Sequence, residues 1–140
     1  MLSVLRHWGH VSSPLKMARI LLADDHELIR KGLRALIEVN KNWTICGEAG
    51  NGQEAVDRVV ELKPDLVILD VTMPILNGLQ AARLIRERVP GTKILILSMH
   101  DSLQLANEAF RLGADAYLVK SGPQAQLLDT IAGLVQRQMN

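Results

Sequence analysis

The chain has few aromatic residues, a single cysteine and no long apolar run. Only 3% of its 140 residues are aromatic, so aliphatic side chains must build the core. Cys46 cannot form an internal disulfide, and we expect it to be a small buried side chain. No run approaches the ~20 apolar residues of a membrane span. The formal net charge of +1 gives no general attraction to nucleic acid or membrane. These absences leave one globular domain of ordinary size, since 48% of the residues are hydrophobic.

The first residues differ from the rest of the chain. Residues 1–17 lack the long apolar core and the cleavage site of a signal peptide. We expect residues 1–17 to form a flexible extension and residues 18–138 to form the domain. A single cysteine is compatible with a reducing compartment, and we expect the protein in the cytoplasm.

Four short apolar runs each end at a polar or charged residue. They are 19–23 before Asp24 and Asp25, 65–69 before Asp70, 93–97 before Ser98, and 116–119 before Lys120. Such runs are typical of strands buried on both faces of a parallel sheet. Ligands bind such sheets beyond the carboxyl ends of the strands, so these residues should form one cluster. Three carboxylates repel one another unless a cation joins them, and Mg²⁺ prefers oxygen ligands. The sequence therefore predicts a magnesium site able to accept a phosphoryl group.

The segments between these runs show helical spacing of apolar residues. Helices are predicted over 26–38, 53–62, 79–89, 102–112 and 123–138, and an alternating strand over 43–49. Within 53–62 we expect Val59 and Val60 to face inward. Met73 should pack inward, and Gly78 should allow a close approach at the start of a helix. Regular alternation of strands and helices predicts an α/β fold, a doubly wound parallel sheet of five strands.

Each candidate residue also has a simpler structural explanation. Adjacent aspartates before a helix are most often N-caps, so Asp24 and Asp25 could be caps. Lys120 could be a solvated lysine, Ser98 a satisfied hydroxyl at a strand end, and Tyr117 an ordinary packing residue. Their joint placement at the ends of neighbouring strands favours a shared site.

Several motifs resemble one known family. They are LLADDHELIRKGLRALIE, DLVILDVTMPILNGLQ, ILILSMH and GADAYLVKS, in that order along the chain. These residues resemble the receiver domain of two-component response regulators, over roughly residues 18–138. The motif ADDHELIRKGL and the DxxMPxxxG loop resemble the NarL/FixJ subfamily, whose receivers precede a LuxR-type helix-turn-helix. The resemblance implies a flavodoxin-like (βα)5 fold.

The resemblance also implies a role for each acidic residue. Asp70 resembles the phosphoryl acceptor, and Asp25 resembles a direct ligand of Mg²⁺. Asp24 resembles the second acid, which reaches the metal through water. The backbone carbonyl of Thr72 falls at the third metal-ligand position.

Four further positions match family residues that bind the phosphoryl group or respond to it. Lys120 resembles the lysine that pairs with the acceptor and the phosphoryl oxygens. Ser98 resembles the hydroxyl that binds a phosphoryl oxygen, and Tyr117 falls at the aromatic switch position. His100 lies where the family tunes dephosphorylation, although it could also be an exposed loop residue.

The implied function is a phosphorylatable switch, charged by a sensor histidine kinase in a Mg²⁺-dependent reaction. Phosphorylation and dephosphorylation would be self-catalysed, without enzymatic turnover. The surface around the 103–112 helix and the fifth strand would repack, and homodimer formation is a further expectation. We expect no output domain, no basic recognition helix and hence no direct DNA contact within these 140 residues, and no membrane partner.

Four interpretations remain open from the sequence. The chain could be the receiver part of a transcriptional regulator, or a stand-alone receiver that acts by docking or as a phosphate sink. It could be a haloacid-dehalogenase-type phosphatase, although that family carries a DxD pattern after its first strand. It could also be a pseudo-receiver that docks without phosphorylation.

Overall fold

The computed structural model describes residues 17–139. The expected extension over residues 1–17 therefore lies outside the described residues, apart from Met17, which is exposed. None of the described helices is long and apolar enough to cross a membrane.

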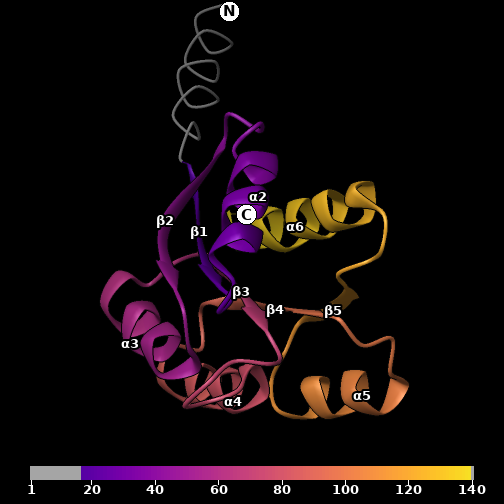
Figure 1. Ribbon diagram of the computed structural model, residues 1–140. Helices are drawn as coiled ribbons and strands as arrows, with labels where there is room; N and C mark the ends of the chain where they lie inside the picture. Colours follow the sequence, from indigo (N-terminus) through magenta and orange to yellow (C-terminus); the bar gives the residue numbers. More distant parts are fainter. Residues whose placement is uncertain (1–16, 140) are drawn as a thin grey trace, which may run out of the picture.

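Five strands alternate with five helices along the described chain (Figure 1). In chain order they are β1 (Ala18–Ala23), α2 (Glu27–Ile37), β2 (Trp43–Ala49), α3 (Gly52–Leu62), β3 (Leu66–Asp70), α4 (Gly78–Arg88), β4 (Lys93–Ser98), α5 (Leu103–Arg111), β5 (Ala116–Val119) and α6 (Gln124–Met139). All neighbouring strands pair in parallel, in the order β2-β1-β3-β4-β5. This order is that of flavodoxin-like sheets, so the predicted doubly wound (βα)5 fold is confirmed.

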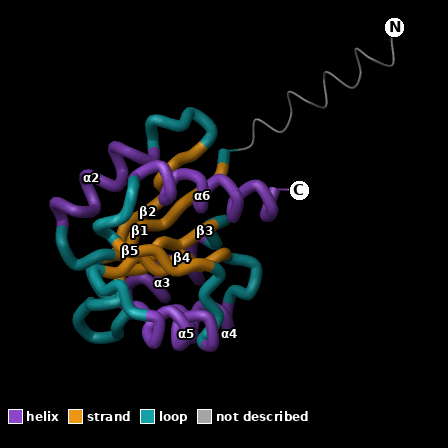
Figure 2. Tube along the Cα trace, turned by 90° about the vertical axis from the view of Figure 1, so that its right-hand side faces the viewer, coloured by secondary structure: helices purple, strands orange, loops and turns teal. Residues whose placement is uncertain are grey.

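Helices cover both faces of the sheet (Figure 2). One core forms where α3, α4 and α5 pack on alternate residues of the central strands, among them Leu21, Val67 and Ile96. The other forms where α2 and α6 pack on the intervening residues, among them Ile20 and Leu95. Since successive side chains of a strand point to opposite faces, the apolar runs of β1, β3 and β4 are buried on both sides.

The last of the four apolar runs, residues 116–119, corrects one expectation. All four residues of β5 are only half-buried, although the sequence predicted burial on both faces. The reason is position, because β5 lies at an edge of the sheet and lacks a neighbour on one side.

Two side chains and one strand boundary also differ from the sequence-based expectation. Cys46 is half-buried, not buried, because it lies on the edge strand β2. Val60 was expected to face inward and is 42% exposed, whereas Val59 is fully buried. The third strand begins at Leu66, one residue later than predicted, and the carboxylate of Asp65 accepts a hydrogen bond from the Arg19 N–H just before it.

Three of the helices begin at side-chain caps, whereas α2, near the site, does not. Asn51, Asn77 and Ser102 accept hydrogen bonds from backbone N–H groups at the starts of α3, α4 and α5. Helix α2 begins after His26, which makes no side-chain cap. The alternative that Asp24 and Asp25 are the N-caps of this helix is therefore wrong.

Candidate functional site

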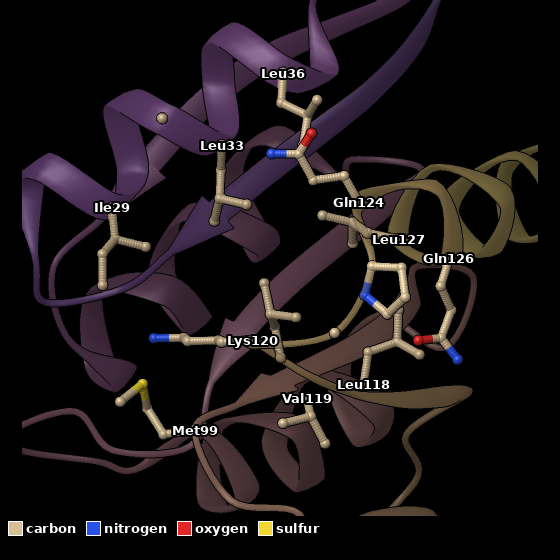
Figure 3. A pocket seen from close by; sticks show the side chains of 14 residues that line it. Ile29, Leu33, Leu36, Met99, Leu118, Val119, Lys120, Gln124, Gln126 and Leu127 are labelled. Atoms are coloured by element: carbon tan, nitrogen blue, oxygen red, sulfur yellow. The ribbon is translucent and has the colours of Figure 1, made fainter.

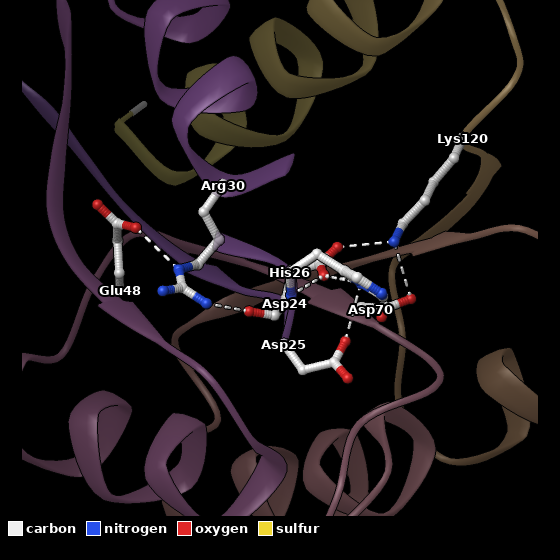
Figure 4. A network of polar contacts seen from close by, with 7 residues as sticks. All are labelled: Asp24, Asp25, His26, Arg30, Glu48, Asp70 and Lys120. Carbon is white, nitrogen blue, oxygen red and sulfur yellow. Dashed lines mark hydrogen bonds and ion pairs between the residues drawn. The ribbon is translucent and has the colours of Figure 1, made fainter. Parts of the chain in front are cut away.

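The carboxyl ends of β1, β3 and β5 bring three charged side chains together (Figure 4). The ammonium Nζ of Lys120 lies 2.6 Å from Oδ2 of Asp24 and 3.2 Å from Oδ1 of Asp70. Both carboxylates are almost fully buried, at 2% and 4% exposure. The alternative that Lys120 is a solvated surface lysine is thus wrong.

Asp24 is fixed by contacts on its main chain and side chain. Its N–H donates to the carbonyl of Ala49 (3.0 Å), and its Oδ1 accepts from the N–H of His26 (2.9 Å). Burial acts to raise the pKa of Asp24, but hydrogen bonds from Lys120 and the His26 N–H outweigh it. The pKa therefore lies below its usual value, and Asp24 is anionic at neutral pH.

Asp70 is the last residue of β3, and its pKa is shifted in the opposite direction to that of Asp24. Burial and the nearby charge of Asp24 raise its pKa above the usual value, while Lys120 and the N–H of Thr72 only partly compensate. A nearby cation stabilises the charged form of a carboxylate that burial disfavours. The site therefore favours a metal ion or another positive group beside Asp70.

The loop after Asp70 returns close to it at Gly78. The Gly78 N–H donates to the Val71 carbonyl (2.8 Å), and a Cβ at Gly78 would lie 2.0 Å from the Asp70 carbonyl oxygen. The predicted close approach is confirmed, because only glycine leaves room for it. Met73 of the same loop is buried, as predicted.

Four side chains could together hold a metal ion. Ligand atoms of Asp24, Asp25, His26 and Asp70 all lie within 4.8 Å of one another, and Nδ1 of His26 is 3.0 Å from Oδ1 of Asp25. Carboxylate oxygens are the donors that Mg²⁺ prefers, so the three aspartates fit this ion. Asp25 is exposed and open to water, in keeping with an ion that retains water ligands. Thr72 is also exposed, and its carbonyl stays a predicted ligand.

Lys120 is held in place by its two carboxylate partners and by its own backbone N–H. Burial acts to lower the pKa of Lys120, but the hydrogen bond to Asp24 and the charge of Asp70 outweigh it and raise the pKa. The Lys120 N–H donates to the carbonyl of Ser98 (2.6 Å), which ties the end of β5 to the end of β4. Lys120 is therefore a fixed cation at the acidic cluster.

Ser98, His100 and Tyr117 form a second, linked group. Ser98 is fully buried, and its Oγ accepts a hydrogen bond from the His100 N–H (3.0 Å). The hydroxyl of Tyr117 donates to the carbonyl of His100 (2.6 Å). Asp70 pairs with Leu97 across the sheet, which places Ser98 one residue further along β4. The exposed His100 thus connects the predicted hydroxyl to the predicted aromatic switch through its backbone.

The sequence missed two features around this cluster. The first is a pocket of about 380 Å³ between α2, the end of β5 and the start of α6 (Figure 3). Ile29, Leu33 and Leu118 are among its apolar lining residues, and Lys120 borders it. The second is Arg30, whose guanidinium reaches back to the carbonyl of Asp24. The spacing of apolar residues in 26–38 indicated the helix but gave no sign of either.

Comparisons with known proteins agree on one family. The model of the response regulator receiver domain matches residues 20–132. The transcriptional regulatory protein YdfI of Bacillus subtilis (strain 168) is 39% identical over 120 residues, which cover 86% of this chain and 56% of YdfI. The nitrate/nitrite response regulator protein NarL of Escherichia coli (strain K12) is 36% identical over 114 residues, 81% of this chain and 53% of NarL. The chain thus spans about half the length of these curated relatives.

A solved structure gives the same result in three dimensions. The crystal structure of a two-component response regulator of the LuxR family from Aurantimonas sp. SI85-9A1 matches with a TM-score of 0.83. It is 37% identical, and the match covers 87% of each chain.

Proposed function

We propose that this chain, which belongs to the response regulator receiver domain family, is a phosphorylatable signalling switch with Asp70 as its acceptor. The predicted resemblance to receivers of the NarL and LuxR type is confirmed by the relatives of that type. One observation supports the acceptor most directly. Asp70 is buried at a strand end, 3.2 Å from Lys120 and within reach of two further carboxylates.

In the proposed reaction, a carboxylate oxygen of Asp70 attacks the phosphorus of a phosphohistidine or a small phosphodonor. The new O–P bond forms as the P–N bond of a phosphohistidine breaks, and the leaving nitrogen keeps the electron pair and takes up a proton. Lys120 neutralises charge on the acceptor and the phosphoryl oxygens. Asp24, Asp25, Asp70 and the Thr72 carbonyl would hold Mg²⁺, which supplies two positive charges against those oxygens.

The switch would start at Ser98. Its Oγ accepts the His100 N–H, and turning toward a phosphoryl oxygen would release this contact. Tyr117 holds the carbonyl of the same residue, so its packing would change as well. The surface around α5 and β5 would then repack, as a two-state response to a local change of charge.

The partner that delivers the phosphoryl group is proposed to be a sensor histidine kinase. The pocket beside Lys120 has an apolar lining, supplied in part by Ile29 and Leu33 of α2. Apolar side chains of a kinase helix could fill it while the phosphohistidine reaches Asp70. Ile29→Asp should then slow transfer from autophosphorylated kinases of the source organism and leave phosphorylation by acetyl phosphate unchanged. Equal effects on both donors would contradict this docking surface.

We assign the output to gene regulation. The named relatives are regulators in which the matched residues make up only about half of the protein, which favours the receiver part of a transcriptional regulator over a stand-alone phosphate sink. Any DNA contact would then be made outside the present residues. Met99, Leu103 and Phe110 are exposed near α5 and offer an apolar surface for a homodimer. We place the switch in the cytoplasm, where its kinase partner would present phosphohistidine.

Intact-mass measurement tests the central proposal. After incubation with acetyl phosphate and Mg²⁺, the protein should gain one phosphoryl group, and chelation of Mg²⁺ should abolish the gain. A folded protein that gains no mass from acetyl phosphate or from any kinase would favour the docking module without phosphorylation. Steady hydrolysis of a phosphate ester would instead favour the phosphatase.

A further inference from the structure

Arg30, Arg34 and Glu48 form an ion-pair cluster on the α2 side of the acidic site. The proposed reaction assigns no role to these three residues. Arg30 and Arg34 lie one turn apart on α2, and both contact the carboxylate of Glu48 on β2. Nε of Arg30 is 2.9 Å from Oε1 of Glu48, and the guanidinium of Arg34 donates to Oε2 at 3.0 Å and 2.7 Å. Each oxygen of Glu48 is thus engaged by one arginine.

The same Arg30 also touches the acidic site (Figure 4). Its NH1 group donates to the carbonyl oxygen of Asp24, six residues earlier in the chain. The N–H of Asp24 donates to Ala49, the residue that follows Glu48. Both backbone polar groups of Asp24 are therefore held from the end of β2, one directly and one through Arg30.

We propose that Arg30 and Glu48 form a clamp that positions Asp24 and Asp25 to bind Mg²⁺. This inference rests on the proposed function and gives a role to residues that make no contact with the reacting atoms. The turn at Asp24 and Asp25 lies between β1 and α2, and within it the side chain of Asp24 accepts a hydrogen bond from the His26 N–H. Arg30 adds a restraint from α2 itself, because a planar guanidinium can bond a carboxylate and a carbonyl at the same time.

Glu48 has two effects in this arrangement. It holds the guanidinium of Arg30 in the orientation that reaches Asp24. It also balances positive charge close to a site that must attract a divalent cation. Burial acts to raise the pKa of Glu48, but Arg34 and Arg30 outweigh it and lower the pKa, so this charge persists at neutral pH.

Calorimetric titration with Mg²⁺ tests the clamp without phosphorylation. Groups that support metal ligands typically change metal affinity by about 10- to 100-fold, so Arg30→Gln should weaken binding about 10-fold. Glu48→Gln should weaken it as well, because Arg30 then loses its orientation and its balancing charge. Arg30→Lys should restore little, since a single ammonium cannot reproduce the planar fork. At saturating Mg²⁺, each variant should be phosphorylated by acetyl phosphate at a rate close to that of wild type.

Arg86 provides a matched control. Its guanidinium also bonds a carbonyl and a carboxylate, those of Gly113 and Asp115, but next to the start of β4. Arg86→Gln should lower the melting temperature as Arg30→Gln does and leave the affinity for Mg²⁺ within twofold. If Arg30→Gln does not fold, Glu48→Gln decides the question.

The outcomes separate the two proposals. A wild-type protein that binds Mg²⁺, with Arg30 and Glu48 variants that bind it equally well, would overturn the clamp alone. An equal loss of affinity in Arg86→Gln would also overturn it, because the effect would then be general destabilisation. A folded wild-type protein that binds no Mg²⁺ would overturn the proposed function and the clamp together.

Discussion

Lys120 lies closer to Asp24 than to Asp70, at 2.6 Å against 3.2 Å, although 96 positions separate Lys120 from Asp24 in the chain. The lysine therefore balances two buried carboxylates at once. A metal ion at this site would compete with the ammonium for the same oxygens. This competition gives opposite predictions for metal binding and for phosphorylation.

Replacing Lys120 by Met should tighten Mg²⁺ binding severalfold and slow phosphorylation by acetyl phosphate at least 10-fold. The ammonium no longer occupies the carboxylate oxygens, but it also no longer neutralises the phosphoryl oxygens. Stability without Mg²⁺ should fall by about 3 kcal/mol, because two buried carboxylates lose their cation. Calorimetry, intact mass and urea unfolding measure the three effects.

Lys31→Gln is the control for this variant. Lys31 forms only an exposed pair with Glu27 (3.4 Å), so its loss should change stability by less than about 0.5 kcal/mol. A Lys120→Met protein with unchanged affinity for Mg²⁺ would show that the lysine and the metal do not share ligands.

Replacing Asp70 by Asn should abolish the gain of a phosphoryl group and stabilise the protein. The pKa of Asp70 is raised in the fold, so its charged form costs free energy at neutral pH. Removing this charge should increase the free energy of unfolding at pH 7, without Mg²⁺, by on the order of 1 kcal/mol. Urea unfolding measures the increase.

Asp57→Asn, on the exposed side of α3, should keep both phosphorylation and stability near wild type. Phosphorylation of Asp70→Asn at the wild-type level would show that the acceptor is a residue other than Asp70. Equal or lower stability would show that Lys120 fully compensates the buried charge.

Acid should destabilise the wild-type protein through the Glu48 carboxylate. The pKa of Glu48 is lowered in the fold, so its contribution to stability is present above the unfolded pKa of about 4.3 and is lost as the pH falls through the folded value. Glu48→Gln should reduce the free energy of unfolding by about 1 kcal/mol at pH 7 and flatten its decline below about pH 5. Denaturant unfolding at several pH values measures both.

The exposed Glu87→Gln provides the comparison for this acid effect. It should leave the pH dependence of wild type unchanged. A decline in Glu48→Gln as steep as in wild type would assign the acid sensitivity to other carboxylates, such as Asp24, whose pKa is also lowered.

The strands and the acidic cluster were predictable because they depend on local pattern and topology. Short apolar runs predicted the strands, and parallel strands place their carboxyl ends on one edge of the sheet. That reasoning was enough to bring Asp24, Asp70 and Lys120 together before any contact was known.

The contacts that decide side-chain orientation were not predictable in the same way. The reach of Arg30 to the Asp24 carbonyl depends on Glu48, which belongs to another strand. The partial exposure of β5 depends on strand order, which the sequence pattern alone does not determine. Such features arise from tertiary packing, so the periodicity of apolar residues along one segment does not predict them.

His100 should set the lifetime of the phosphorylated protein. Its backbone is held on both sides, by Ser98 Oγ and by the hydroxyl of Tyr117, while its side chain remains exposed. An imidazole on this loop, next to Ser98, can direct water toward the acyl phosphate. His100→Ala should therefore lengthen the half-life of the phosphorylated form severalfold and leave the rate of its formation unchanged. Intact mass followed over time, after removal of acetyl phosphate, measures the half-life.

Gln104→Ala tests whether this effect belongs to the imidazole. Gln104 is exposed near the start of α5, and its truncation should leave the half-life within the error of wild type. Tyr117→Phe removes one support of the His100 backbone and should change the half-life in a different way, because the imidazole remains but its loop is freer. Equal half-lives in wild type and His100→Ala would assign the rate of hydrolysis to the buried groups around Asp70. The loop at His100 would then serve only to transmit the change from Ser98 to Tyr117.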